Sequence, residues 1–94
     1  MSRQAGVFVP SWFVYILRSC SREFTYIGST NDLWRRFDEH NRGLVQSTRA
    51  YRPLEMVAYV AVKNGIAARA LEKYFKTGSG SAVLKKRILV SENV

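Results

Sequence analysis

The fold is decided by two short runs near the start of the chain, SWFVYILR at residues 11–18 and FTYIG at residues 24–28. Both runs are rich in aromatic and β-branched side chains, which is typical of buried β-strands. The polar segment at residues 19–23 is short enough to join two neighbouring antiparallel strands. We therefore expect a β-hairpin that carries most of the aromatic side chains of this part of the chain.

Beyond the hairpin, the apolar pattern changes to a helical period and back again. Ser29-Thr30-Asn31-Asp32 is a cluster of helix-capping residues, and Gly43 is a natural helix stop. The expected elements are strands at residues 11–18, 24–28 and 54–62, and helices at residues 33–40, 66–76 and 82–89.

This order, β-β-α-β-α-α, predicts a single α+β domain in which helices flank a small three-stranded antiparallel sheet. We expect the domain to occupy residues 11–90, between a short N-terminal tail (residues 1–10) and a C-terminal tail (residues 91–94). The expected inward-facing side chains of the helices are Leu33, Phe37, Ala67, Leu71, Tyr74, Phe75, Leu84 and Ile88.

Charge and composition restrict the function classes. Fifteen Lys and Arg against seven Asp and Glu give a net charge of +8 in 94 residues, which attracts polyanions such as nucleic acid. The sequence contains neither an apolar run long enough to span a membrane nor a recognisable signal peptide, so we expect a cytoplasmic protein. The single cysteine, Cys20, excludes an internal disulfide and a multi-cysteine zinc site, and a nucleophilic role for it is a minor alternative.

Five side chains suit phosphodiester hydrolysis when they are taken together. Tyr15 and Tyr26 lie on the two strands of the hairpin, and Arg36 and His40 lie one helical turn apart on a face distinct from the Leu33/Phe37 side. Glu72 in the next helix could hold a hard metal ion. Taken singly, each has a plainer interpretation, namely core aromatics, a solvated helix face and a surface ion pair.

The same residues, in the same order, resemble the GIY-YIG nuclease family. The resemblance spans residues 12–88, and the short form is similar to the small stand-alone members of that family. It is carried by Phe13-Val14-Tyr15, Tyr26-Ile27-Gly28, Arg36, His40 and the segment Ala70-Leu71-Glu72-Lys73.

The resemblance implies a metal-dependent endonuclease that cuts DNA, and it implies a role for each residue. Tyr15 would help to position or activate water, and Tyr26 would be the favoured general base or water-positioning group. Arg36 would stabilise the phosphoryl transition state, and His40 would shuttle a proton or contact phosphate. Glu72 would hold one Mg²⁺ or Mn²⁺ ion.

The sequence departs from the family pattern at two points. The first motif is Phe-Val-Tyr in place of Gly-Ile-Tyr, although Tyr15 is kept. The asparagine that larger members carry after the metal-binding helix has no clear counterpart, since Asn93 lies in the expected tail. We expect Gly28 to allow a close approach of the backbone to the site, or to serve the turn into the next helix.

Other residues could form the track along which a nucleic acid lies. Such contacts would set affinity and salt dependence rather than sequence choice, so specificity would be weak or would come from a protein partner. DNA is the expected substrate, RNA is not excluded, and DNA repair is one pathway beside recombination and phage defence. The candidate nucleic-acid-binding residues are Gly28, Arg35, Arg42, Arg49, Arg52, Lys73, Lys85 and Lys86.

Two other hypotheses remain beside the nuclease. The chain could be a non-catalytic nucleic-acid-binding domain that has the fold without turnover. It could also be a basic interaction module with no nucleic-acid role. The presence of all five site-type residues favours the enzyme over both, because a scaffold does not need them.

Overall fold

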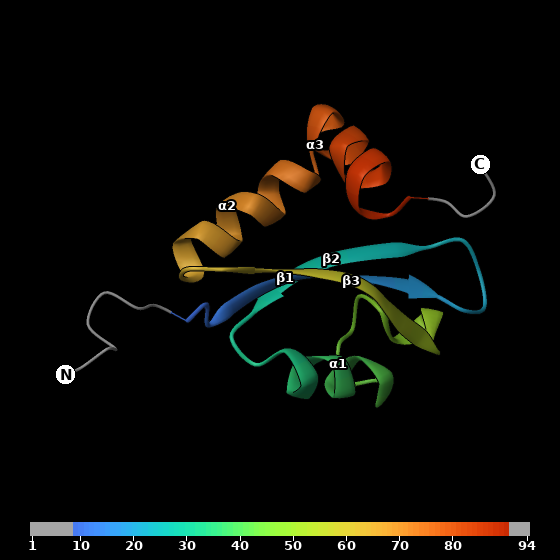
Figure 1. Ribbon diagram of the computed structural model, residues 1–94. Helices are drawn as coiled ribbons and strands as arrows, with labels where there is room; N and C mark the ends of the chain where they lie inside the picture. The colour runs from blue at the N-terminus through green and yellow to red at the C-terminus, as the bar shows by residue number, and fades with distance from the viewer. Residues whose placement is uncertain (1–8, 91–94) are drawn as a thin grey trace.

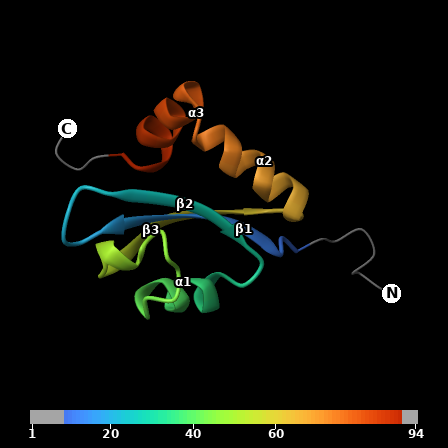
Figure 2. The same ribbon diagram turned by 180° about the vertical axis from the view of Figure 1, so that it is seen from behind.

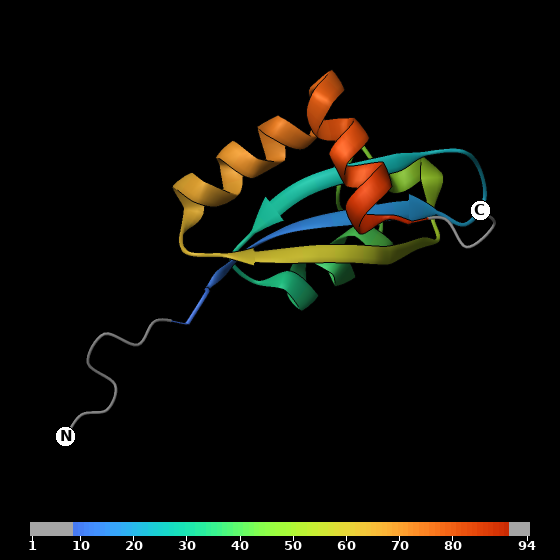
Figure 3. The same cartoon turned by 45° about the horizontal axis from the view of Figure 1, so that its top comes forward.

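A three-stranded antiparallel sheet forms the centre of the protein, as a computed structural model that describes residues 9–90 shows. Strand β1 (Trp12–Ser19) lies in the middle, with β2 (Thr25–Thr30) on one side and β3 (Leu54–Val62) on the other. Figure 3 shows the three strands side by side in the order β2-β1-β3. The expected α+β class and three-stranded antiparallel sheet are confirmed.

Helices cover both faces of the sheet (Figures 1 and 2). Helix α1 (Leu33–Asn41) lies against one face, and α2 (Gly65–Phe75) and α3 (Gly78–Val83) lie against the other. A π-helical turn, η2 (Leu84–Ile88), continues α3, and a short 3₁₀ turn, η1 (Arg49–Tyr51), lies in the loop after α1. No helix within residues 9–90 is long and apolar enough to cross a membrane.

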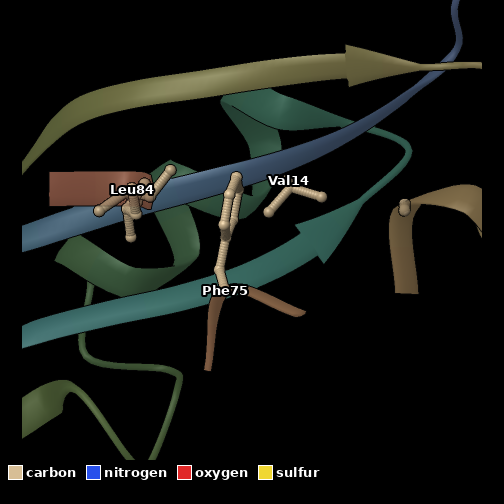
Figure 4. Packing of buried hydrophobic residues seen from close by; sticks show 5 residues of the cluster. Val14, Phe75 and Leu84 are labelled. Carbon is tan, nitrogen blue, oxygen red and sulfur yellow. The ribbon is translucent and has the colours of Figure 1, made fainter. Parts of the chain in front are cut away.

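The central strand is buried on both faces, because its neighbouring side chains point in opposite directions. Val14 and Ile16 point toward α2 and α3, where they pack against Ala68, Phe75 and Leu84. Figure 4 shows Val14, Phe75 and Leu84 meeting in this layer. Burial of these side chains holds α2 and η2 to the sheet.

On the opposite face, Tyr15 and Leu17 pack toward α1. They form a second buried cluster with Leu33 and Leu54. Strand β3 bulges opposite Ile16 and Leu17, where the register with β1 shifts by one residue. The aromatic run of the hairpin is thus divided between two cores, and a tyrosine faces the smaller one.

Several boundaries differ from those expected. Strand β2 continues through Ser29 and Thr30, so only Asp32 of the expected capping cluster caps α1, by accepting from the Arg35 N–H. Helix α3 begins at Gly78 rather than at residue 82, because the Thr77 side chain caps it by accepting from the Gly80 N–H at 3.0 Å.

The inward side of α2 is rotated from the expected one. Ala68 and Phe75 are buried and Leu71 packs beside them, whereas Tyr74 is 40% exposed and Ala67 is only partly buried. Tyr74 was therefore wrongly placed in the core. The expected inward positions of Leu33, Phe37, Leu84 and Ile88 are confirmed.

The contact between α2 and α3 leads to a paired prediction. A Cβ atom on Gly80 would overlap the backbone carbonyl of Tyr74, whereas a Cβ on Gly78 meets nothing within 4 Å. Gly80→Ala should lower the free energy of unfolding by about 1–3 kcal/mol through overpacking. Gly78→Ala should be neutral or stabilise by up to about 1 kcal/mol. Urea unfolding measures both, and equal stability of the two variants would contradict this account of the contact.

Candidate active site

A chain of three buried side chains lies beneath α1. The Tyr15 hydroxyl is 2.9 Å from His40 Nε2, and His40 Nδ1 is 2.7 Å from Thr48 Oγ1. The three residues have exposed fractions of 1%, 0% and 0%. They come from β1, from α1 and from the loop after α1, so the hydrogen bonds join three separate parts of the chain.

Tyr26 and Arg36 complete this cluster on its more open side. The Tyr26 ring centroid lies 6.2 Å from that of Tyr15 and 5.1 Å from that of His40. Tyr26 and Arg36 are both only partly buried, and Arg36 donates to Glu39 at 3.0 Å. Of the two tyrosines in the cluster, Tyr26 is therefore the more accessible to solvent.

Burial controls the protonation state of Tyr15. Desolvation raises its pKa from 10.0 to about 12, although the nearby Arg36 guanidinium opposes the rise. The negative charge of Glu72 acts in the same direction as burial. Tyr15 therefore carries its proton at neutral pH and acts as a hydrogen-bond donor, so the ionised phenol needed for general-base chemistry is disfavoured there.

His40 is neutral for a similar reason. Desolvation lowers its pKa from 6.5 to about 4, and the positive charge of Arg36 adds to this effect. Its side chain is fully buried, so the plainer interpretation of a solvated helix face does not hold for His40. With both ring nitrogens occupied, His40 meets the rest of the site through Tyr15 and does not itself face solvent.

Gly28 is the position on β2 that makes room for Tyr15. It lies directly opposite Tyr15 in the antiparallel pairing and is buried. A Cβ atom there would lie 2.5 Å from the Tyr15 hydroxyl oxygen and 3.0 Å from the Tyr26 ring. The group that comes close to the Gly28 backbone is thus the Tyr15 side chain.

Glu72 lies on α2, which covers the opposite face of the sheet. Ser29, the neighbour of Gly28, donates from its hydroxyl to Glu72 Oε1 at 2.7 Å, and Lys76 Nζ donates to Oε2 at 2.8 Å. Successive residues of β2 therefore serve the two parts of the site: Gly28 faces Tyr15 on one side, and Ser29 holds Glu72 on the other. The candidate site straddles the edge strand of the sheet.

The chemistry of Glu72 is compatible with one hard divalent cation. Its carboxylate is partly exposed. It accepts a hydrogen bond from Ser29 and already forms an ion pair with the ammonium group of Lys76. A hard cation accepts such a single carboxylate when water and phosphate oxygens complete its ligand set. Within residues 9–90, no three His, Cys, Asp or Glu side chains gather in one place.

The expected basic residues fall on both sides of the sheet. On the α1 side, Arg35 and Arg42 form ion pairs with carboxylates of their own helix, and Arg52 donates to the carbonyl oxygen of Arg49 at 2.9 Å. On the α2 side, Lys73, Lys85 and Lys86 are exposed. Contact of any of them with nucleic acid stays a prediction.

One groove lies on the α2 side of the sheet. It has a volume of about 560 Å³ and lies between β2 and the α2–α3 region. Its basic lining residues are Arg18, Lys76 and Lys85, and its apolar floor includes Phe75 and Leu84. The groove thus carries three basic side chains, one of which, Lys76, is paired with the candidate metal ligand Glu72.

Sequence reasoning missed Ser29, Thr48 and Arg18 as parts of the site. An extension of the strand alternation past Gly28 would have placed Ser29 on the face of α2, but nothing in the sequence signals the partner of Thr48. Cys20 is exposed and His40 is bound to Tyr15 and Thr48, so the two do not form a Cys-His pair.

Comparison with known proteins agrees with the motif pattern. The model of the GIY-YIG catalytic domain family matches residues 11–87, which is most of the chain. Two UPF0213 proteins from strains of Vibrio cholerae serotype O1 are each 38% identical over 68 residues, covering 70% of this chain and 66% of the relative. The chain thus matches just under two thirds of the length of these relatives. A UPF0213 protein of Clostridium perfringens is 37% identical over 65 residues, covering 68% of this chain and 69% of that protein.

The space that the missing side chain of Gly28 leaves for Tyr15 gives a second prediction. Gly28→Ala should displace the Tyr15 hydroxyl, because the added methyl group occupies its place. We expect a loss of stability of about 1–3 kcal/mol from overpacking. The ring of His40 should also change its NMR signals, since it loses the Tyr15 bond. Unchanged histidine signals in a folded Gly28→Ala protein would show that Tyr15 does not depend on this space.

The buried histidine gives a third prediction, for the acid side of the stability profile. The pKa of His40 is about 4 in the folded protein, and we take 6.5 for the unfolded chain. The unfolded chain therefore binds the proton first, and stability should fall as the pH drops from about 6.5 to about 4, by up to about 3 kcal/mol.

Urea unfolding at several pH values tests this, with His40→Gln as the control that removes the titrating ring. The difference between the two profiles isolates the contribution of His40 from those of the carboxylates. A histidine that titrates near 6.5 in the folded protein would contradict the prediction.

Proposed function

This chain belongs to the GIY-YIG catalytic domain family, and from that premise we propose that it is a metal-dependent endonuclease that hydrolyses phosphodiester bonds in DNA. The observation that carries the proposal is the arrangement around β2. Tyr15, Tyr26, Arg36 and His40 cluster on one side of this edge strand, and Glu72 is bound to it from the other. A phosphodiester lying across this edge would meet groups from both sides.

In the proposed reaction, Tyr26 is the general base: it orients the attacking water and takes the proton that the water loses on attack, because it is the more accessible of the two tyrosines in the cluster. Tyr15 remains protonated, since its pKa is raised to about 12, and its oxygen accepts a hydrogen bond from that water. Arg36 remains a cation beside Tyr15 and stabilises the negative charge that grows on the phosphoryl oxygens.

Glu72 would hold Mg²⁺ or Mn²⁺, which supplies Lewis-acid stabilisation of the phosphoryl and leaving oxygens when bound. Ser29 keeps the Glu72 carboxylate oriented, as its hydroxyl donates to Oε1 at 2.7 Å. Lys76, which lines the basic groove and donates to Oε2 at 2.8 Å, would leave that oxygen when the ion is held.

The substrate track in this proposal is the basic groove lined by Arg18, Lys76 and Lys85. Its positive rim and the net charge of +8 support a polyanionic substrate. We propose DNA as that substrate, with RNA as the alternative, and a protein partner as the source of sequence choice. Phosphate contacts of this kind make binding weaker as salt increases.

The fourth prediction tests the activity. Wild-type protein should nick supercoiled plasmid in the presence of Mg²⁺ or Mn²⁺ and not in the presence of chelator. Glu72→Gln removes the charge with little change of shape, and should reduce the nicking rate by roughly 100-fold or more while DNA binding persists. Glu55→Gln, at an exposed carboxylate of β3, is the matched control and should be fully active.

The outcomes separate the hypotheses. Loss of nicking in Glu72→Gln alone supports the endonuclease. Salt-sensitive DNA binding by the wild type without cleavage in either metal would instead favour a non-catalytic nucleic-acid-binding domain. Absence of both binding and cleavage would favour the basic interaction module.

A further inference from the structure

The imidazole ring of His40 lies between two hydroxyl groups, and the positions of the protons decide what Tyr15 presents to the site. Nε2 is 2.9 Å from the Tyr15 oxygen and Nδ1 is 2.7 Å from Thr48 Oγ1. A neutral imidazole has one N–H donor and one bare nitrogen acceptor. One hydroxyl must therefore donate to the ring while the other accepts from it.

Only one arrangement of the protons gives every donor among Tyr15, His40 and Thr48 an acceptor on the protein. With the proton on Nδ1, the ring donates to Thr48, the Thr48 hydroxyl has the Val45 carbonyl oxygen at 3.5 Å, and Tyr15 donates to Nε2. With the proton on Nε2, the ring would donate to the Tyr15 oxygen. The buried hydrogen of Tyr15 would then have no other side-chain or backbone acceptor within residues 9–90, which is costly.

Thr48 is held in place to accept the Nδ1 proton. Its backbone N–H donates to the Val45 carbonyl at 3.2 Å, and its own carbonyl accepts from the Tyr51 N–H at 2.9 Å. The Tyr51 ring stacks on Phe24 of the hairpin with the ring centroids 3.7 Å apart. The loop after α1 is thus pinned to the sheet next to Thr48.

We infer that Thr48 is a positioning residue of the site: its hydroxyl accepts from the Nδ1–H of His40 and so holds the ring with its bare Nε2 as the acceptor of the Tyr15 proton. The Tyr15 hydrogen then points into the protein, and the lone pairs of its oxygen point toward Arg36 and the open side. This orientation lets Tyr15 accept a hydrogen bond from a water, and that consequence rests on the proposed function.

The experiment reads the tautomer directly. His40 is the single histidine of the chain, so long-range ¹H–¹⁵N spectra of labelled protein at pH 7 report it without ambiguity. The wild type should show a protonated Nδ1 and a bare Nε2. Thr48→Val keeps the shape but removes the acceptor of the Nδ1 proton. The Nδ1–H tautomer should remain, because Tyr15 still needs Nε2 as its acceptor, but the Nδ1–H signals should shift and the Nδ1 proton should exchange faster with water. Thr48→Ser should restore the wild-type signals.

Plasmid nicking adds a second reading that is independent of the tautomer measurement. Thr48→Val should lower kcat by about 10-fold with little change in KM, as expected for loss of a group that orients a reacting side chain, and Thr48→Ser should recover most of the rate. If no variant cleaves DNA, the proposed function fails, whereas the NMR result still decides the tautomer.

Three results would overturn the inference: an Nε2–H ring in the wild type, Nδ1–H signals in Thr48→Val that match the wild type, or a Thr48→Ser protein that resembles Thr48→Val. Circular dichroism establishes that each variant is folded. If Thr48→Val does not fold, the wild-type and Thr48→Ser spectra still decide, because both must show the Nδ1–H form.

Discussion

The structure depends on one constraint, namely that the central strand β1 is buried on both of its faces. Val14 and Ile16 have apolar partners, but Tyr15 brings a hydroxyl group into the opposite core. A buried hydroxyl must find a hydrogen-bond partner, and His40 supplies it. The histidine in turn needs a partner for its second nitrogen, which is Thr48. One polar atom on the central strand thus determines what α1 and the following loop must place beneath the sheet.

Much of the fold could be predicted from the sequence because local patterns determine it. The aromatic and β-branched runs indicated the hairpin, the helical spacing of Leu33 and Phe37 indicated α1, and the β-β-α-β-α-α order follows from these elements. The motif residues were found in the same way, since their types and order are visible in the sequence. Their chemical roles are a separate question, because roles depend on burial and charge rather than on order.

The remaining features depend on contacts between residues far apart in the chain. The burial of His40 follows from its packing against Tyr15, which no helical period reveals. Ser29 looked like part of a helix cap because Ser is a common cap, but β2 is extended past Gly28 by its pairing with β1. The early start of α3 has a local cause, the Thr77 cap, in a glycine-rich segment that reads as a loop.

Gly28 and Ser29 contact opposite halves of the candidate site, so the single strand β2 fixes the distance between these halves. Their separation is set by the pleat of β2, so movement of the loops leaves it unchanged. Because one strand holds both halves, the site is also sensitive to the register of that strand. If β2 slipped by one position along β1, every side chain of the strand would exchange faces, and Tyr15 would lose its space at the moment when Glu72 lost its hydroxyl donor. The site would then disappear as a whole rather than in parts, so that correct strand alignment acts as an all-or-none condition for assembling it.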